Sequence, residues 1–177
     1  MSRPWNDWYH ITGNTYGTWL YGSDLGFRTR HHREHIEGDY LNPPPPGMYR
    51  RERERSLRLM QRSPVYLSPE AQRLACNAIF ESLSRDGLDV VIVSVDDHHY
   101  HILARVRDHR PRYWVGRAKG RAARTLSRAD LLPTGGAWGK RCACKPIHDR
   151  AHQVQCANYI RNHQKKGASI RHLKPTA

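Results

Sequence analysis

Two histidines separated by one bulky residue, His99 and His101, are the residues of this sequence best spaced to do chemistry. Side chains alternate between the two faces of a β-strand, so both imidazoles would lie on one face, about 6.6 Å apart along the backbone. Ring nitrogens at that spacing can converge on one divalent metal ion. The alternative is a pair of solvated strand histidines, and a His-x-His pattern alone does not decide between the two.

A tyrosine and a histidine one helical turn apart, Tyr159 and His163, stand in a later segment with helical periodicity. Residues four apart are neighbours on a helix surface. We expect Val154, Ala157 and Ile160 to form the apolar face of this helix, with the tyrosine and the histidine on the opposite, polar face. A tyrosine placed there can contact a phosphate or a base, or it can act as a nucleophile.

Positive charge is concentrated in the second part of the chain. Residues 105–177 carry 18 Lys and Arg but 3 Asp and Glu, whereas residues 1–104 carry 12 and 13. Nucleic-acid phosphate is the commonest partner for such a surface. Part of this charge falls on a helix expected over 112–128, whose basic stripe holds Arg117, Arg121, Arg124 and Arg128.

Regular elements must position these residues, and their signals begin at Trp8. Ser68 is a suitable N-cap for a helix with Pro69 in its first turn, and Gly87 is placed to end that helix. The expected elements are a strand from Trp8, a helix from Pro69, strands over 88–95 and 99–106 joined by a turn, the helix over 112–128, a strand over 138–147 and a helix over 150–166.

This order of elements predicts an α+β fold, the ferredoxin-like split βαβ sheet (β-α-β-β-α-β) with an added C-terminal helix. The sheet face that carries the histidines is expected to be open. We divide the chain into a first strand within 1–21, a long Pro- and Arg-rich excursion over 22–65 that is partly flexible, the remainder of the domain over 66–166, and a basic tail over 167–177.

The composition also bears on the compartment and on the remaining cysteines and histidines. Apolar runs are too short for a membrane helix, so we expect a cytoplasmic, nucleoid-associated protein with no membrane partner. Its four cysteines are expected to be reduced, with Cys142 and Cys144 on one face of a strand as packing residues rather than zinc ligands. The histidine-rich run over 31–35 is interpreted as a solvated segment, not a second metal site.

Three short motifs together resemble the HUH single-tyrosine transposases, which include the REP-associated tyrosine transposases and related single-strand insertion-sequence enzymes. The motifs are H-Y-H at 99–101, K-G-R-A-A-R at 119–124 and N-Y-I-R-N-H at 158–163. The resemblance covers 66–166 and the first strand. It implies a metal-dependent transposase that nicks and rejoins single-stranded or hairpin DNA through a 5′-phosphotyrosine, with Mg²⁺ or Mn²⁺ as cofactor, and a homodimer.

Carried over residue by residue, the resemblance makes His99 and His101 metal ligands and Tyr159 the nucleophile. The family's third ligand falls on His163, where Gln or Asn is usual. The residues expected to bind DNA are Arg105, Arg117, Lys119, Arg121, Arg124 and Arg128. The alternative is a noncatalytic ferredoxin-like nucleic-acid-binding protein, which would typically carry aromatic residues on its open sheet face, where this sequence has histidines and Arg105.

Overall fold

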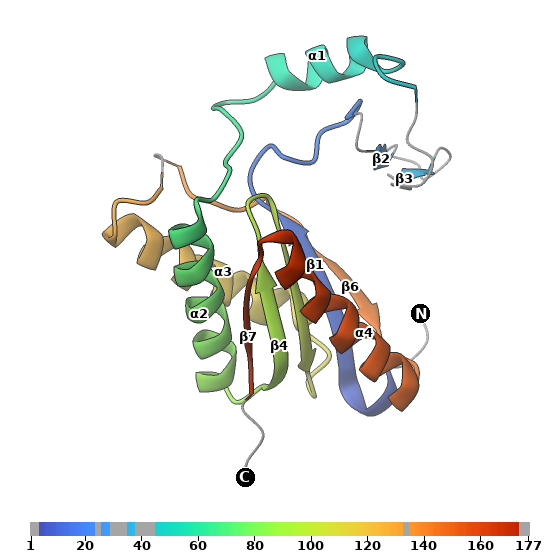
Figure 1. Ribbon diagram of the computed structural model, residues 1–177, viewed down its shortest axis with the longest axis vertical. Helices are drawn as coiled ribbons and strands as arrows, with labels where there is room; N and C mark the ends of the chain where they lie inside the picture. Colours follow the sequence, from blue (N-terminus) through green and yellow to red (C-terminus); the bar gives the residue numbers. More distant parts are fainter. Residues whose placement is uncertain (1–3, 24–25, 29–34, 38–44, 133–134, 174–177) are drawn as a thin grey trace. The chain divides into compact units, whose positions relative to one another are not determined.

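The computed structural model describes residues 4–23, 26–28, 35–37, 45–132 and 135–173 (Figure 1). Its larger unit comprises Met1–Tyr16 and Val65–Ala177. This unit contains a five-stranded sheet in the order β6-β1-β5-β4-β7, and every neighbouring pair is antiparallel. The strands are β1 (Trp8–Asn14), β4 (Asp89–Val95), β5 (His99–Arg105), β6 (Ala143–Pro146) and β7 (Ser169–His172).

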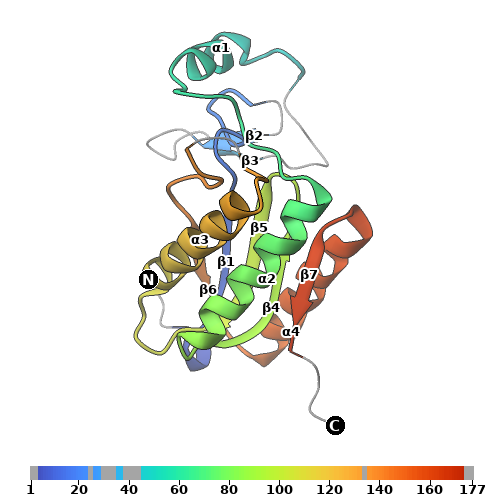
Figure 2. The ribbon, with the colours of Figure 1, turned by 90° about the vertical axis from the view of Figure 1, so that its left-hand side faces the viewer.

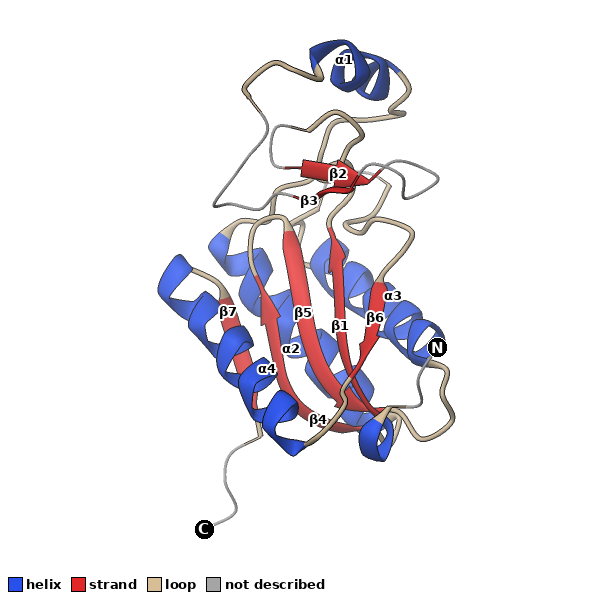
Figure 3. Ribbon diagram, turned by 90° about the vertical axis from the view of Figure 1, so that its right-hand side faces the viewer, coloured by secondary structure: helices blue, strands red, loops and turns tan. Residues whose placement is uncertain are grey.

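Helices cover both faces of this sheet. The helices α2 (Pro69–Arg85) and α3 (Pro111–Arg128) lie on one face (Figure 2). The helix α4 (Arg150–Asn162), which continues into the 3₁₀ turn η2 (His163–Lys166), lies on the other (Figure 3). A short 3₁₀ turn, η1 (Trp5–Asp7), precedes β1. The fold is therefore of the α+β class, and within the described ranges no helix is both long and apolar enough to cross a bilayer.

Each face of the sheet has its own core. On the α2 and α3 side, the inward residues of β5 are Tyr100, Ile102 and Ala104, all fully buried. On the α4 side a smaller core contains Ile92, Leu103, Ile147, Cys156 and Ile160. The histidine face was expected to be open, and this is only partly correct, because α4 covers its β4 and β5 side while the β6 residues on that face are exposed. Leu103 and Ile92 make that face apolar beside the histidines, and burying them under α4 removes apolar surface from water.

Local signals set the ends of α2 as expected. The Ser68 hydroxyl oxygen accepts a hydrogen bond from the Ala71 N–H at 3.2 Å, and Pro69 is the first helical residue. Gly87, with φ +82, stands just after the helix, where the backbone turns left-handed. The following strand pair, β4 and β5, is joined by the turn predicted over 96–98.

One glycine of β1 is required by a close approach. Gly13 is directly opposite Tyr100 in the β1–β5 register. A Cβ at this position would overlap the Tyr100 hydroxyl and ring edge, so a larger residue would displace the tyrosine. The missing side chain of Gly13 therefore leaves room for the Tyr100 ring within the α3-side core. There the ring meets Trp138 edge to face, with 5.5 Å between the ring centroids.

The segment expected to be a basic tail contributes a fifth strand. β7 pairs with β4, with Ser169 opposite Val95 and His172 opposite Ile92. The Arg171 side chain reaches α2 and donates hydrogen bonds to the side-chain oxygens of Asn77 (3.1 Å) and Glu81 (2.7 Å). Four residues are too few to show a period of two clearly, so composition alone suggested a tail.

The second unit, Gly17–Pro64, corresponds to the expected excursion. It contains two short paired strands, β2 (Gly26–Arg28) and β3 (His35–Glu37), and the helix α1 (Arg50–Arg58). The helix was missed because it buries no side chain and lacks apolar periodicity; an Arg50–Glu54 ion pair at 2.9 Å supports it instead. Most of the 31–35 histidine run and half of the proline run lie outside the described residues.

Candidate metal and tyrosine site

Three histidines from two elements meet on the α4 side of the sheet. His99 and His101 come from β5, and His163 comes from the junction of α4 and η2. One ligand nitrogen from each lies within 4.8 Å of the others. The ring centroids are 4.7 Å apart for the two β5 histidines, and that of His163 lies 4.5 Å from His101 and 5.4 Å from His99. The structure thus brings together the three residues expected as metal ligands.

The turn before β5 fixes the position of His99, the first residue of that strand. Asp96 accepts hydrogen bonds on one carboxylate oxygen from the backbone N–H groups of His98 (3.0 Å) and His99 (2.7 Å). Its other oxygen lies 2.6 Å from Nδ1 of the His99 ring. A single aspartate therefore shapes the turn and orients the first histidine of the cluster.

The helix α4 is rotated relative to the expected apolar face. Its buried side chains are Gln153, Cys156 and Ile160, followed one turn later by His163, whereas Val154 is 44% exposed. The apolar pattern did not predict this side because two of its buried residues are polar. Gln153 accepts a hydrogen bond from the Arg150 side chain, and His163 belongs to the histidine cluster. His163 therefore lies on the sheet side of the helix and not on its solvent side.

Polar contacts made through Nδ1 leave Nε2 available on each ring. His163 Nδ1 lies 3.0 Å from the Tyr159 carbonyl oxygen, which can only accept, so Nδ1 carries the proton. His99 Nδ1 faces the Asp96 carboxylate, and His101 Nδ1 lies 3.1 Å from His10 Nε2. In each case Nε2 remains as the ligand atom. His101 Nε2 is buried and has no hydrogen-bond partner among the described residues, which a bound cation would remedy.

Burial favours the neutral form of the His101, His163 and His10 rings, which is the form that binds a metal. Desolvation lowers the pKa of His101 to about 2, with further contributions from neighbouring His99 and His10. Desolvation also lowers the pKa of His10 to about 4 and lowers that of His163. For Asp96 burial alone would raise the pKa, but the His99 ring and backbone N–H groups lower it to about 2. The cluster therefore combines three imidazoles, of which burial favours the neutral form for His101 and His163, with one carboxylate, a set that could hold a metal ion.

Tyr159 lies at the rim of this cluster. It is 51% exposed, and its ring meets His163 at 4.8 Å and His101 at 5.5 Å between centroids, both edge to face. Its position one turn before His163 on α4 brings the phenol to the histidines while leaving one side open to solvent. A tyrosine hydroxyl and three histidines that could hold a metal ion are therefore adjacent.

Sequence reasoning missed two residues of the site, His10 and Asp96. His10 stands on β1, whose register with β5 places Thr12 opposite His101. Because side chains alternate, His10 then lies on the histidine face, and its ring stacks on that of His101 at 5.3 Å. The alternation of side chains along β1 already indicated which residues share a face with His10. That this face is the one with His99 and His101 follows only from the pairing of β1 with β5.

No protein-family model and no curated protein matches the chain. Its function has to be inferred from the geometry and chemistry of the site.

The cations expected to bind DNA are dispersed. Arg117 and Arg121 lie 3.5 and 3.1 Å from the Asp86 carboxylate, and Arg105 lies 3.9 Å from Asp89. Lys119 is only 8% exposed and donates a hydrogen bond to the Gly139 carbonyl at 2.6 Å, so it lies off the outer stripe of α3. Arg124 and Arg128 are exposed. The whole helix α3 lies on the sheet face opposite the histidine cluster (Figures 2 and 3).

Proposed function

We propose that this protein nicks and rejoins single-stranded DNA, with Tyr159 as the nucleophile and a metal ion held by His99, His101 and His163. The observation that carries the proposal is the position of the tyrosine ring beside three convergent imidazoles. This arrangement is the one that the resemblance to HUH single-tyrosine transposases implies, with a histidine in place of the usual amide.

The topology supports the same proposal. Without β7, the strand order β6-β1-β5-β4 with α2 and α3 on one face agrees with a ferredoxin-like split βαβ fold. In that arrangement β1 and β5 are the central strands, and they carry His10, His99 and His101. The helix α4 then corresponds to the added catalytic helix, packed on β4 and β5 on the opposite face.

The donor set favours Mn²⁺ among the two expected ions. Mg²⁺ is held in proteins mainly through oxygen, whereas imidazole nitrogen suits transition metals. When bound, the ion polarises phosphoryl oxygens and favours ionisation of a nearby hydroxyl. The neutral His101 ring can bind a cation, and the Asp96 carboxylate next to His99 orients the His99 ring toward the same site.

The chemistry assigned to this chain is a pair of phosphoryl transfers. The Tyr159 oxygen attacks the phosphorus, the bond from phosphorus to the 3′-oxygen breaks, and the strand leaves a 3′-hydroxyl while its 5′-phosphate stays on the tyrosine. A 3′-hydroxyl then attacks the phosphotyrosine and restores the phosphodiester, so no external energy source is needed. The exposed side of the Tyr159 ring gives a DNA strand access to the hydroxyl. The tyrosine and the three histidines of a single chain lie together, so the proposal needs no residue from the second subunit of the expected homodimer.

A noncatalytic nucleic-acid-binding module is the competing proposal. Such a module of this fold class would stack bases on aromatic residues of an open sheet face. Here α4 covers the β4 and β5 side of that face, where Leu103 is fully buried. The β5 residues on that face are two histidines, Leu103 and Arg105 rather than aromatic residues, which argues for the enzyme.

The deciding experiment is a search for a covalent protein–DNA adduct. A pool of labelled single-stranded hairpins with randomised flanks is incubated with the protein and Mn²⁺, and denaturing electrophoresis separates covalent from bound DNA. The parent and the matched control Tyr66→Phe, which also alters an exposed tyrosine, should form the adduct. Tyr159→Phe should bind hairpins within about 3-fold of the parent and form none, because the hydroxyl is lost while the ring stays. Hairpin binding without an adduct in the parent would favour the noncatalytic module.

A further inference from the structure

Two cysteines lie side by side at the start of β6, on the other side of the sheet from the histidines. The sulfur atoms of Cys142 and Cys144 are 3.8 Å apart. Both side chains pack against the α3-side core, while Ala143 between them is exposed. The remaining two cysteines, Cys76 and Cys156, are buried in separate places.

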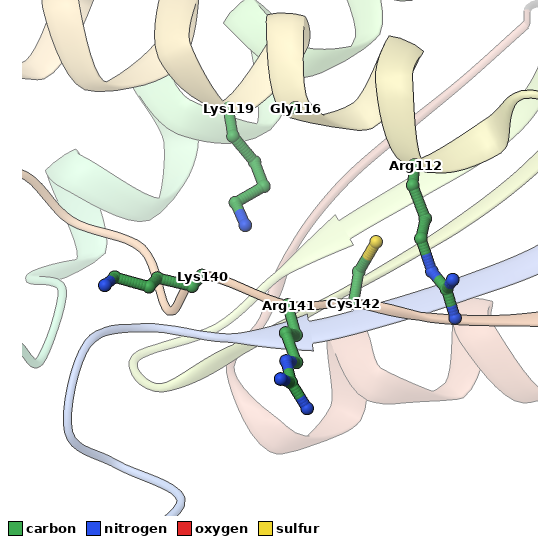
Figure 4. A pocket seen from close by; sticks show the side chains of 6 residues that line it. All are labelled: Arg112, Gly116, Lys119, Lys140, Arg141 and Cys142. Carbon is green, nitrogen blue, oxygen red and sulfur yellow. The ribbon is translucent and has the colours of Figure 1, made fainter.

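Cys142 also lines a pocket of about 340 Å³ between α3 and the segment leading into β6. The other lining residues are Arg112, Gly116, Lys119, Lys140 and Arg141 (Figure 4). Four of the six are cationic, and no acidic residue is among these described lining residues. The Cys142 sulfur points toward α3 in this pocket (Figure 4). The surroundings therefore favour a negatively charged sulfur.

A buried cation adds to this effect, while burial of the Cys142 sulfur itself raises its pKa. Lys119 is 8% exposed, and its ammonium group, with one hydrogen bond to the Gly139 carbonyl, is held close to the pocket. The hydrogen bond between the two thiols lowers the pKa of Cys142 to about 7, and the charges of Lys119 and Arg112 act in the same direction. The same bond, together with burial, raises the pKa of Cys144. One sulfur is thus ionised near neutral pH while its neighbour keeps a proton.

The charge around the pair decides between two uses of adjacent cysteines. A separation of 3.8 Å would also suit two thiolate ligands of a tetrahedral metal ion. However, the charges of Lys119 and Arg112 repel another cation, and neither cysteine belongs to a group of three potential ligands in the described part of the chain. A thiolate beside cations and a second thiol instead suits reaction with a neutral oxidant.

We propose that Cys142 and Cys144 form a redox modification site, in which a hydroperoxide oxidises Cys142 and Cys144 then closes a disulfide. The Cys142 sulfur attacks one peroxide oxygen, the O–O bond breaks, and the departing oxygen takes up a proton as an alcohol or water. Cys142 is then a sulfenic acid. The Cys144 sulfur attacks it, the S–O bond breaks, and the hydroxyl leaves as water with the thiol proton. The sulfur pair loses two electrons, which the peroxide gains.

The backbone permits this disulfide but strains it. Residues two apart in an extended strand have Cα atoms about 6.6 Å apart, near the upper end of the disulfide range of about 4.4–6.8 Å. A strained, accessible disulfide is more easily reduced than a structural one. The site should therefore cycle between dithiol and disulfide, and it does not depend on the function proposed for the histidine cluster.

The first test uses the unaltered protein and its own buried cysteines as controls. Burial raises the pKa of Cys76 to about 12 and that of Cys156 to about 11, so both are almost entirely protonated at pH 7. Weighing thiolate fraction against intrinsic nucleophilicity, Cys142 should be alkylated by iodoacetamide at least about 50-fold faster than either. Peptide mass spectrometry resolves the sites. Equal rates for Cys142 and Cys76 in the folded protein, or a preference that persists in urea, would overturn the proposal.

The second test follows oxidation by hydrogen peroxide. In the parent, the peptide that contains both Cys142 and Cys144 should lose two hydrogens, and dithiothreitol should restore them. Cys144→Ser keeps a hydrogen-bond donor but cannot close the bond, so a dimedone-trapped sulfenic acid should accumulate on Cys142. Cys142→Ser should give neither product. If peroxide leaves the parent peptide as a dithiol, or if the sulfenic acid of Cys144→Ser appears on Cys76 or Cys156, the assignment is wrong.

Discussion

The buried histidines predict that the metal-free protein loses stability in mild acid. Folding holds the pKa of His10 at about 4 and that of His101 at about 2, against an ordinary value of 6.5 in the unfolded chain. Below pH 6.5 these two histidines therefore bind protons in the unfolded state but stay unprotonated in the folded state. The free energy of unfolding must fall as the pH falls through 6.5, and the loss continues to about pH 4 for His10 and about pH 2 for His101.

The size of the loss follows from linkage. Between pH 7.5 and 5.5 each such histidine lowers the free energy of unfolding by about 1.4 kcal/mol, so the pair lowers it by about 2.7 kcal/mol. His163, whose pKa is also lowered, acts in the same direction. Asp96 does not contribute in this window, because a pKa lowered to about 2 stabilises the fold above pH 3.8 and is lost only as the pH falls toward 2.

Urea denaturation followed by circular dichroism at pH 7.5 and 5.5, with EDTA present, measures this loss. His10→Gln should reduce the change in the free energy of unfolding between pH 7.5 and 5.5 by about 1.4 kcal/mol, because one of the two histidines that take up a proton on unfolding is removed. His148→Gln, at an exposed histidine outside the cluster, is the matched control and should leave the difference unchanged. A parent protein that is equally stable at both pH values, or a His10→Gln variant that keeps the full difference, would refute the assignment of buried neutral imidazoles.

Three further expectations concern the metal and DNA. Isothermal titration calorimetry should show no Mn²⁺ binding by His99→Ala/His101→Ala, and parent-like affinity would contradict the ligand assignment. His10→Phe keeps a ring against His101 but removes the nitrogen that orients it, so Mn²⁺ affinity should fall about 10–100-fold, and no change would mean that His10 does not orient its neighbour. Arg124→Ala should lower the salt slope of single-strand DNA binding by about 0.7, measured by fluorescence anisotropy, and an unaltered slope would exclude this residue from the phosphate contacts.

Much of the α+β framework could be predicted from local signals. The Ser68 cap, Pro69 and the apolar spacing that follows identify α2, because each acts within one turn of helix. The alternation of β5 placed His99 and His101 on one face and Tyr100 on the other, and the burial of Tyr100 against the α3-side core agrees with it. These predictions needed no knowledge of which elements are neighbours.

The features that were missed depend on tertiary contacts. The sequence pattern predicted that Val154 is a core residue and His163 a surface residue. In the structure Val154 is exposed, and His163 is buried in the histidine cluster, so that a different side of α4 faces the sheet. β7 is ordered by pairing with β4 and by the contacts of Arg171 with α2, none of which is local in sequence. His10 became part of the site only through the pairing of β1 with β5.

The separation of the histidine cluster from α3 restricts how a DNA strand could use both. Two cations whose charge reaches the cluster are Lys145, which acts on His10, and Lys166, which acts on His163. Lys145 belongs to β6, the edge strand next to β1, and the pocket lined by Arg112 and Arg141 opens at the same edge. Under the proposed function, a strand held at Tyr159 would therefore reach α3 by crossing the β6 edge. Phosphates near the cut would then be neutralised by Lys145 and Lys166, and those farther along by α3, so that substitutions on α3 reduce binding while leaving the bond-breaking step intact.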